Sequence, residues 1–261
     1  MYSGIARRAA MLVALVTPAM LPAQAALRAT SAPGAAPPLL STAAAARLKP
    51  VKWTYMTRLM NGGPPQGLGI RTLELVPATF KGAPAWLVID TRQFSTVTLA
   101  ESLYVSRADL EPLHRAAHSP RSDVVAEYGR DSIHTTFGGE SGNASVAMAN
   151  EPRLLANTYL LELVVGAAQL TADWRTSAKL AAVSPQESGV IPIETHTIGE
   201  ETVIIPDGSF DCWVVAMDAG ASRQKLWVRK SDGVVVKERI PVIGMQNAEL
   251  ELLLAAGGAR K

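Results

Sequence analysis

Two turn signals divide the segment from Val203 to Ile240 into long β-prone runs, and this pattern constrains the fold more than any other feature. The signals are Pro206-Asp207-Gly208 and Ser231-Asp232-Gly233, both built from residues that favour tight turns. The runs around them are rich in valine, isoleucine and tryptophan, as strands are. The sequence therefore predicts antiparallel strands here, and the turn residues themselves indicate no catalytic function.

The alternation of apolar and polar residues extends along most of the chain. Val51, Trp53 and Tyr55 alternate with Lys52 and Thr54, which predicts a strand with one buried face. One helix is expected over residues 152–168, where apolar residues recur at helical spacing. Further strands are expected at residues 71–76, 85–90, 103–107, 124–128, 132–137, 144–148, 178–183, 190–198, 202–205, 210–218, 224–230 and 249–254, the last of which suits a helix equally well.

The first 46 residues predict export rather than a folded element. Residues 1–25 combine two arginines, an apolar stretch and a small-residue cleavage site, as secretory signal peptides do. Residues 26–46 are a low-complexity stretch rich in alanine and proline, expected to be a disordered tether. Residues 47–261 then form a single β-rich domain in the periplasm or outside the cell, with no transmembrane span.

The charge balance disfavours nucleic acid as a partner. The whole chain has a net charge of +2, and cleavage after residue 25 removes Arg7 and Arg8 and no acid, which leaves a net charge of 0. Proteins that bind nucleic acid need a basic surface to neutralise phosphates. We therefore expect no nucleic-acid partner.

Pairing of two tryptophan-rich strands predicts a sheet with two unlike faces. If Asp218 lies opposite Gln224, Val215 lies opposite Trp227, and Arg229 can lie over Trp213. An aromatic face needs a cover, either the predicted helix or a ligand such as a lipid or acyl chain in a cleft. The candidate wall residues are Trp53, Tyr55, Trp86, Val88, Trp213, Val215 and Trp227. The expected fold is mainly β, a strongly curved antiparallel sheet, or half-barrel, with a helix packed on its concave side.

Patterns that resemble catalytic motifs are incomplete. Ser141 lacks the final glycine of a nucleophile elbow, and His114 and His118 lack the glutamate of a zinc helix. Asp90 precedes Thr-Arg, where an aspartic protease has Thr-Gly. Cys212 has no second cysteine to pair with and is expected to be a small buried side chain. We therefore expect no catalytic residue, no metal and no cofactor, and a hydrolase centred on Ser141 remains an alternative.

The motifs of the C-terminal half resemble an uncharacterised family of exported bacterial domains of unknown function. The matching stretches are 203–215, 225–228 and 232–237, with 103–105 and 109–113 before them. That family is similar to the half-barrels of the lipoprotein localisation factors LolA and LolB, which hold acyl chains. The resemblance implies a non-catalytic periplasmic protein that binds a lipid, a lipoprotein or another envelope ligand. The alternative is a structural or adaptor module that docks an envelope protein through its aromatic sheet face.

Overall fold

The computed structural model describes residues 38–259, apart from positions 141, 187, 221, 243 and 246. The helices are α2 (Thr42–Ala45) and α3 (Tyr159–Ala167). The strands are β1 (Val51–Met60), β2 (Gln66–Phe80), β3 (Ala83–Phe94), β4 (Val97–Ser106), β5 (Pro112–Ser119), β6 (Ser122–Tyr128), β7 (Ser132–Gly139), β8 (Ala144–Ala149), β9 (Leu154–Leu155), β10 (Arg175–Val183), β11 (Ser188–Ile205), β12 (Gly208–Ala219), β13 (Ser222–Arg229), β14 (Val235–Pro241) and β15 (Glu249–Ala259).

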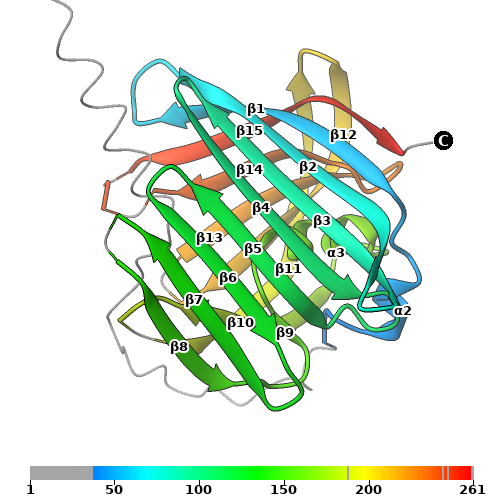
Figure 1. Cartoon of the computed structure of the whole chain (residues 1–261). Helices are drawn as coiled ribbons and strands as arrows, with labels where there is room; N and C mark the ends of the chain where they lie inside the picture. Colours follow the sequence, from blue (N-terminus) through cyan, green and yellow to red (C-terminus); the bar gives the residue numbers. More distant parts are fainter. Residues whose placement is uncertain are drawn as a thin grey trace, which may run out of the picture.

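All the described strands belong to one sheet, in the order β8-β7-β6-β5-β4-β3-β2-β1-β15-β14-β13-β12-β11-β10-β9 (Figure 1). Neighbouring strands are antiparallel, except that β9 runs parallel to β10. The last strand, β15, lies between β1 and β14 and so joins two meanders, β1 to β8 and β9 to β14. This arrangement confirms the prediction of a mainly β fold built on one large antiparallel sheet.

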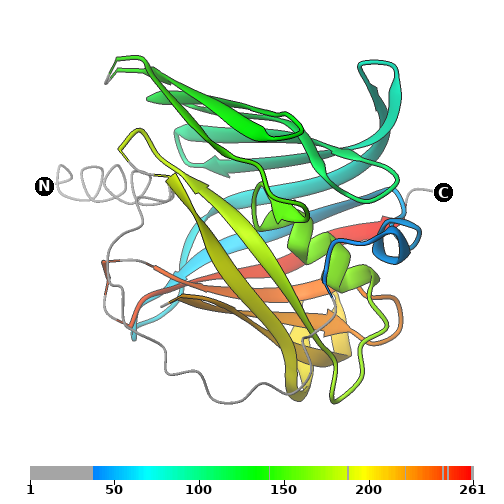
Figure 2. The same cartoon turned by 90° about the horizontal axis from the view of Figure 1, so that it is seen from below.

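The sheet bends round on itself without closing. Figure 2 shows that β5 to β8 lie across from β10 and β11, and β8 contacts β11 although the two are not paired. Met148 of β8 and Val183 and Val190 of the β10–β11 hairpin all pack against one small hydrophobic cluster, separate from the main core. The far part of β11 contacts β14 and β15. The terminal strand β8, and β11 near the other end of the sheet, therefore contact strands with which they are not paired.

The last residues of the expected tether pack against the domain. Within the expected tether, Leu39 donates its backbone N–H to the Ser177 carbonyl at 2.9 Å, beside β10. The Ser41 hydroxyl accepts a hydrogen bond from the Ala44 N–H and so caps α2. Leu39, Leu40 and Ala45 are buried in the main core. The expected signal peptide, residues 1–25, and residues 26–37 of the expected tether lie outside the described part of the chain.

Two secondary-structure predictions need correction. The helix begins at Tyr159 rather than at residue 152, because Leu154 and Leu155 pair with β10 instead. The Asn157 side chain accepts a hydrogen bond from the Leu160 N–H at 3.3 Å, just before the helix begins. Strand β5 was not predicted, because its prolines and histidines weaken the pattern. The ambiguous C-terminal segment is a strand, β15, rather than a helix.

The expected pairing of β12 with β13 is wrong by one residue. Asp218 lies opposite Arg223 instead of Gln224, so Trp227 faces Val214 and Val215 faces Leu226. Because side chains alternate between faces, this shift moves Trp227 to the face opposite Val215. Lys230, not Arg229, lies over the Trp213 ring, with 4.2 Å between the amine and the ring centroid.

Candidate functional site: a charged cluster among the core residues

Arg71 of β2 is the centre of a buried charged cluster. Arg71, Leu73 and Leu75 are spaced two residues apart, so they point to the same face of the sheet, and only 1% of the surface of Arg71 is exposed. Its Nε donates to Asp90 Oδ1 of β3 at 2.6 Å. Its Nη1 and Nη2 donate to the two carboxylate oxygens of Glu162 in α3, both at 3.0 Å. This fork-to-carboxylate pair ties the helix to the sheet.

Two more charged residues complete the cluster. Arg71 Nη1 also donates to Glu238 Oε2 of β14 at 3.1 Å, and Arg92 Nε of β3 donates to Asp90 Oδ2 at 2.9 Å. The Tyr159 ring of α3 lies against both guanidiniums, 5.0 Å from Arg71 and 4.7 Å from Arg92. We call Arg71, Asp90, Arg92, Glu162 and Glu238 the Arg71 cluster. It joins β2, β3, β14 and α3, which are far apart in the sequence.

The pKa values within the Arg71 cluster follow from burial and charge. Burial, together with the neighbouring Glu162, raises the pKa of Glu238 to about 8. Burial also raises the pKa of Glu162, although Arg71 opposes that shift. For Asp90, burial is outweighed by Arg71 and Arg92, and the pKa is lowered. At neutral pH, Glu238 is therefore mostly protonated.

A second polar contact holds the start of α3. Arg115 of β5 forms two hydrogen bonds to Glu101 of β4, at 2.8 and 3.3 Å. Asn157 Nδ2 donates to Glu101 Oε1 at 2.6 Å, while Asn157 Oδ1 accepts from the Leu160 N–H. The first turn of α3 is thus fixed to the sheet through one asparagine.

The end of α3 packs directly on backbone. A Cβ added at Gly166 would lie 2.5 Å from the Gly233 carbonyl oxygen and 3.4 Å from the Trp53 ring. Gly233 has a φ of +76°, which favours glycine, and forms the turn between β13 and β14. Glycine is therefore needed on both sides of this contact.

The structure brings most of the predicted wall residues together on the face that carries Arg71, which we call the α3-contacting face. Trp53, Tyr55, Trp86, Val88 and Val215 are buried there in the main core, and Trp213 is partly buried beside them. Trp227 lies on the opposite face, where Lys237 stacks 4.1 Å from its ring and Glu201 accepts its Nε1–H at 2.8 Å. Six of the seven predicted residues therefore share one face.

Several buried side-chain polar atoms of the described residues have no hydrogen-bond partner. Within the described residues, five side-chain atoms are buried without a hydrogen bond, namely Trp53 Nε1, Trp86 Nε1, Thr135 Oγ1, Thr195 Oγ1 and Thr197 Oγ1. A buried donor without an acceptor costs roughly 1–3 kcal/mol. Two of these donors belong to predicted wall residues.

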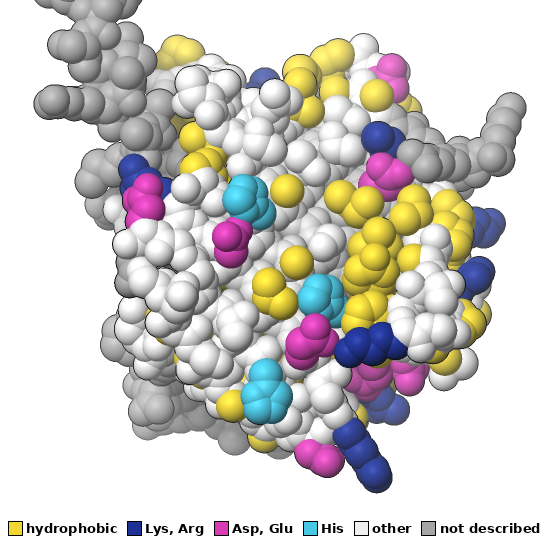
Figure 3. Space-filling model, viewed as in Figure 1, with side chains coloured by type: hydrophobic (Ala, Val, Ile, Leu, Met, Phe, Trp, Pro, Cys, Tyr) yellow, Lys and Arg dark blue, Asp and Glu magenta, His cyan; other side chains and the backbone are white. Residues whose placement is uncertain are grey.

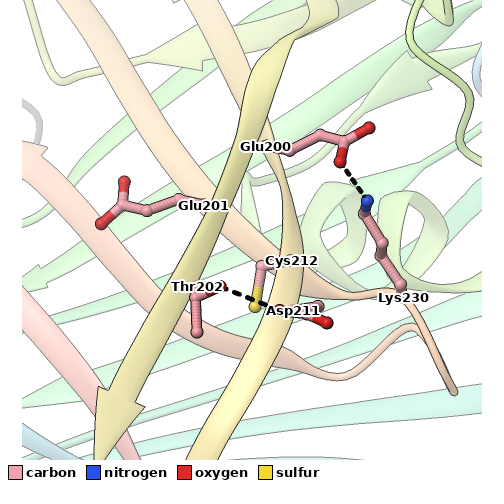
Figure 4. Close-up of a pocket in the computed structure, with 6 residues that line it drawn as sticks. All are labelled: Glu200, Glu201, Thr202, Asp211, Cys212 and Lys230. Carbon is pink, nitrogen blue, oxygen red and sulfur yellow. Dashed lines mark hydrogen bonds and ion pairs between the residues drawn. The ribbon is translucent and has the colours of Figure 1, made fainter.

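One shallow hollow of the described residues is mainly polar. It has a volume of about 270 Å³, lies at β11 and β12, and is lined by Glu200, Glu201, Thr202, Asp211, Cys212 and Lys230 (Figure 4). Lys230 pairs with Glu200, and the Thr202 hydroxyl donates to Asp211, so two of its three carboxylates have partners within the hollow. Burial raises the pKa of the Cys212 thiol to about 11, so it is a weak nucleophile at neutral pH.

The histidines considered as metal ligands lie on a strand. His114 and His118 are on β5, where His114 pairs with Glu127 at 2.9 Å and His118 with Asp123. Figure 3 shows histidine and acidic side chains together on this outer face of the sheet. In the part of the chain that the structure describes, no group of three or more His, Cys, Asp or Glu side chains is arranged to hold a metal ion. Ser141 is not among the described residues.

The likenesses of this chain to known proteins are structural. No protein-family model matches it, and no curated protein matches it. A beta-barrel-like protein of domain of unknown function DUF1849 from Brucella abortus is similar over 82% of this chain and 99% of its own, at 10% identity and a TM-score of 0.49. The hypothetical lipoprotein YmcC from Escherichia coli is similar over 98% and 96%, at 11% identity and a TM-score of 0.31.

No family follows from these scores. Both TM-scores are below 0.5, and neither neighbour carries an established activity in its name. The resemblance to LolA and LolB stays a prediction. Neither α2 nor α3, the helices of the described residues, is long and apolar enough to cross a bilayer.

Sequence reasoning missed the Arg71 cluster, although a signal was present. Arg71 is spaced two residues from Leu73, and Asp90 two residues from Val88. Both charged residues therefore fall at positions of the buried face. Glu162 is the one charged residue in an otherwise apolar helix. A charged residue at a buried position predicts an ionic partner, because an unpaired buried charge is too costly. The pattern does not say which strand supplies that partner.

Proposed function

We propose that the protein is an exported, non-catalytic protein of the cell envelope that binds a lipid, an acyl chain or another amphipathic ligand. In this proposal the curved sheet is a half-barrel, α3 packs on its concave side, and the ligand takes the place of part of α3. The observation that carries the proposal is the burial and the apolar composition of α3. Every residue from Leu160 to Gly166 is buried, and all except Glu162 are apolar or glycine.

An apolar helix surrounded by core residues occupies a space suited to an apolar guest. The nine residues of α3 span about 14 Å at 1.5 Å per residue. A helix this short is not stable by itself, so its position depends on its contacts. Those contacts include the ionic pair with Arg71 and the hydrogen bond of Asn157 to Glu101. An apolar guest that competes for the same surface can displace such a helix without unfolding the sheet.

The indole donors support an amphipathic rather than a purely apolar guest. Trp53 Nε1 and Trp86 Nε1 are buried beside the core and lack acceptors among the described residues. A carboxylate or ester oxygen of a ligand would accept a hydrogen bond from an indole donor. That gain would offset part of the cost of moving α3.

Binding can be tested with defined probes. Native mass spectrometry of gently purified protein is expected to show a bound lipid, and palmitic acid is expected to change tryptophan fluorescence. Trp53→Phe keeps an aromatic ring but removes the donor, and we expect weaker binding of palmitic acid. Trp174→Phe is the matched control, because Trp174 is only partly buried and packs at the margin of the core. Absence of lipid, with no fluorescence response to palmitic acid or an acylated peptide, would contradict the proposal.

The adaptor alternative has less support from the geometry. It assigns docking to an aromatic face, but the Trp227 ring is only 4% exposed. Lys237 and Arg239 lie over that ring, with 4.1 and 5.9 Å to the centroid. A partner protein would have to move both cations before it could reach the indole.

A further inference from the structure

We propose that β8 pairs antiparallel with β8 of a second copy of this chain, so that two sheets join edge to edge in a dimer. The proposal rests on the edge of the sheet and does not depend on the ligand proposed above.

Strand β8 is an open edge. It is the terminal strand in the sheet order and pairs with β7 alone. Among the described residues, the backbone groups of Ala144–Ala149 form no hydrogen bond outside that pairing. The side chains of Ser145, Ala147 and Ala149 are exposed, so the strand is accessible. A row of backbone donors and acceptors is left to water or to another strand.

The features that normally protect an edge are missing from β8. Its sequence, Ala-Ser-Val-Ala-Met-Ala, contains no charge and no proline, and its pairing with β7 has no bulge. The opposite end of the sheet is different. There β9 has two residues, β10 carries Arg175 and Lys179, and the Leu39 N–H is bonded to Ser177 of β10. One edge of the same sheet therefore carries charges and is bonded to another segment of the chain. The other edge, β8, has no charge, and its contact with β11 involves no strand pairing.

A second copy of β8 fits this edge because the strand is complementary to itself. A two-fold axis perpendicular to the sheet brings identical strands together antiparallel and keeps each face on its own side. With the axis at Ala147, Ser145 lies opposite Ala149 of the second copy and Val146 lies opposite its Met148. The side chains that meet on the exposed face are small and uncharged, so identical strands meet without clash or like-charge repulsion.

The pairing also covers apolar surface. Val146 and Met148 are partly buried, and Met148 packs against the same small cluster as Val183 and Val190. The second copy would extend this apolar row across the axis. A six-residue strand gives an interface at the small end of the range for specific association, so the dimer is expected to form reversibly at micromolar concentrations.

Sedimentation of the purified chain tests the dimer directly. Over a hundredfold range of micromolar concentration, the mass is expected to rise from that of a monomer towards twice that value. Ala147→Lys places like charges opposite each other at the axis, and we expect monomer throughout. Val125→Lys is the matched control, because Val125 is 37% exposed on β6, which is paired on both sides. This control is expected to dimerise like the wild type.

Single cysteines introduced at Ser145, Ala147 and Ala149 give a second test of the dimer, which can be read even if Ala147→Lys lowers the stability of the chain. Facing residues of an antiparallel pair have Cα atoms about 4.5–5.5 Å apart, within the range of a disulfide. Mild oxidation is expected to cross-link two chains most efficiently at the position on the axis, while Cys212 stays buried and unreactive. A chain that is monomeric at every concentration overturns the proposal. So does a dimer that Ala147→Lys leaves intact, or one that no β8 cysteine cross-links, since either outcome means that another surface is used.

Discussion

At the scale of residues, the Arg71 cluster is the feature with the largest energetic consequence. Four of its five members are nearly inaccessible to water, and Arg71 is compensated by carboxylates on two other elements, β3 and α3. Removal of one partner from a buried ion pair costs about 3–5 kcal/mol, because the other charge stays buried without compensation. Replacing the whole cluster with apolar residues need not be costly. Single substitutions therefore report on the balance of charge more than on packing.

Glu238→Gln is expected to change the pH dependence of stability more than stability at pH 7. The pKa of Glu238 is about 8 in the folded chain against 4.5 for a free side chain, so the folded state binds more protons between those values. The free energy of unfolding should therefore fall as pH rises from about 5 to 8, by a few kcal/mol at most. Glutamine resembles the protonated acid and should remove that fall. Urea titrations at pH 5, 7 and 8 measure it, and an unchanged slope would contradict the assignment.

Glu162→Gln is the contrasting substitution at the same guanidinium. The two Glu162 oxygens both accept from Arg71, and a glutamine would turn one of them into a donor that faces another donor. We expect the free energy of unfolding at pH 7 to fall by about 2–4 kcal/mol. Chemical denaturation, with Glu238→Gln measured in parallel, checks the difference. Equal effects of the two substitutions would mean that the carboxylates play equivalent roles.

At the scale of elements, α3 is positioned by tertiary contacts rather than by its own propensity. Its apolar residues predict a helix, but its start depends on Asn157 and the pairing of Leu154 and Leu155 with β10. Its end depends on the close approach of Gly166 to the turn at Gly233. The sequence pattern predicts the helix but not the residues at which it begins and ends.

Gly166→Ala is expected to loosen the end of α3. The added methyl would lie 2.5 Å from the Gly233 oxygen, so the helix or the turn must shift. Overpacking of this kind costs about 1–3 kcal/mol. The control is Gly189→Ala on β11, where an added Cβ meets nothing within 4 Å. Thermal unfolding of both variants measures the effect, and equal melting temperatures for the two would show that the contact is not tight in solution.

At the scale of the whole molecule, the C-terminal strand holds the sheet together. Strand β15 pairs with β1 on one side and β14 on the other, so contacts between residues far apart in sequence link the two meanders. The core includes Leu252, Leu253 and Leu254 from this strand, together with residues of β1 and β14. Removal of β15 would expose two new edges in the middle of the sheet.

A chain that ends after Ala248 is therefore expected to lose its cooperative fold. Near-ultraviolet circular dichroism should lose its tertiary signal, and the thermal transition should disappear. A chain that ends after Ala259 retains β15 and is the control, expected to unfold like the full chain. A cooperative transition in the shorter chain would show that the two meanders fold independently.

Most of the strands, their buried positions and most of the turns can be predicted from the sequence, because alternation and turn residues are local signals. The sequence also placed Trp53, Tyr55, Trp86, Val88 and Val215 among buried positions, as the structure has them. Strand β5 was not predicted, because Pro112, His114 and His118 weaken the alternation on which the prediction depends. The candidate site was therefore only half predictable, in its apolar wall but not in its charges.

The tertiary structure decided the rest. The register of β12 with β13 differs by one residue from the expected one, because pairing depends on the whole sheet and not on the turn alone. The position of β15, the burial of Leu39 and Leu40, and the meeting of Arg71 with Glu162 and Glu238 all join segments distant in the chain. Local patterns record which side chains are buried. Which of them meet is set by long-range pairing, whose free energy depends on all the partners together.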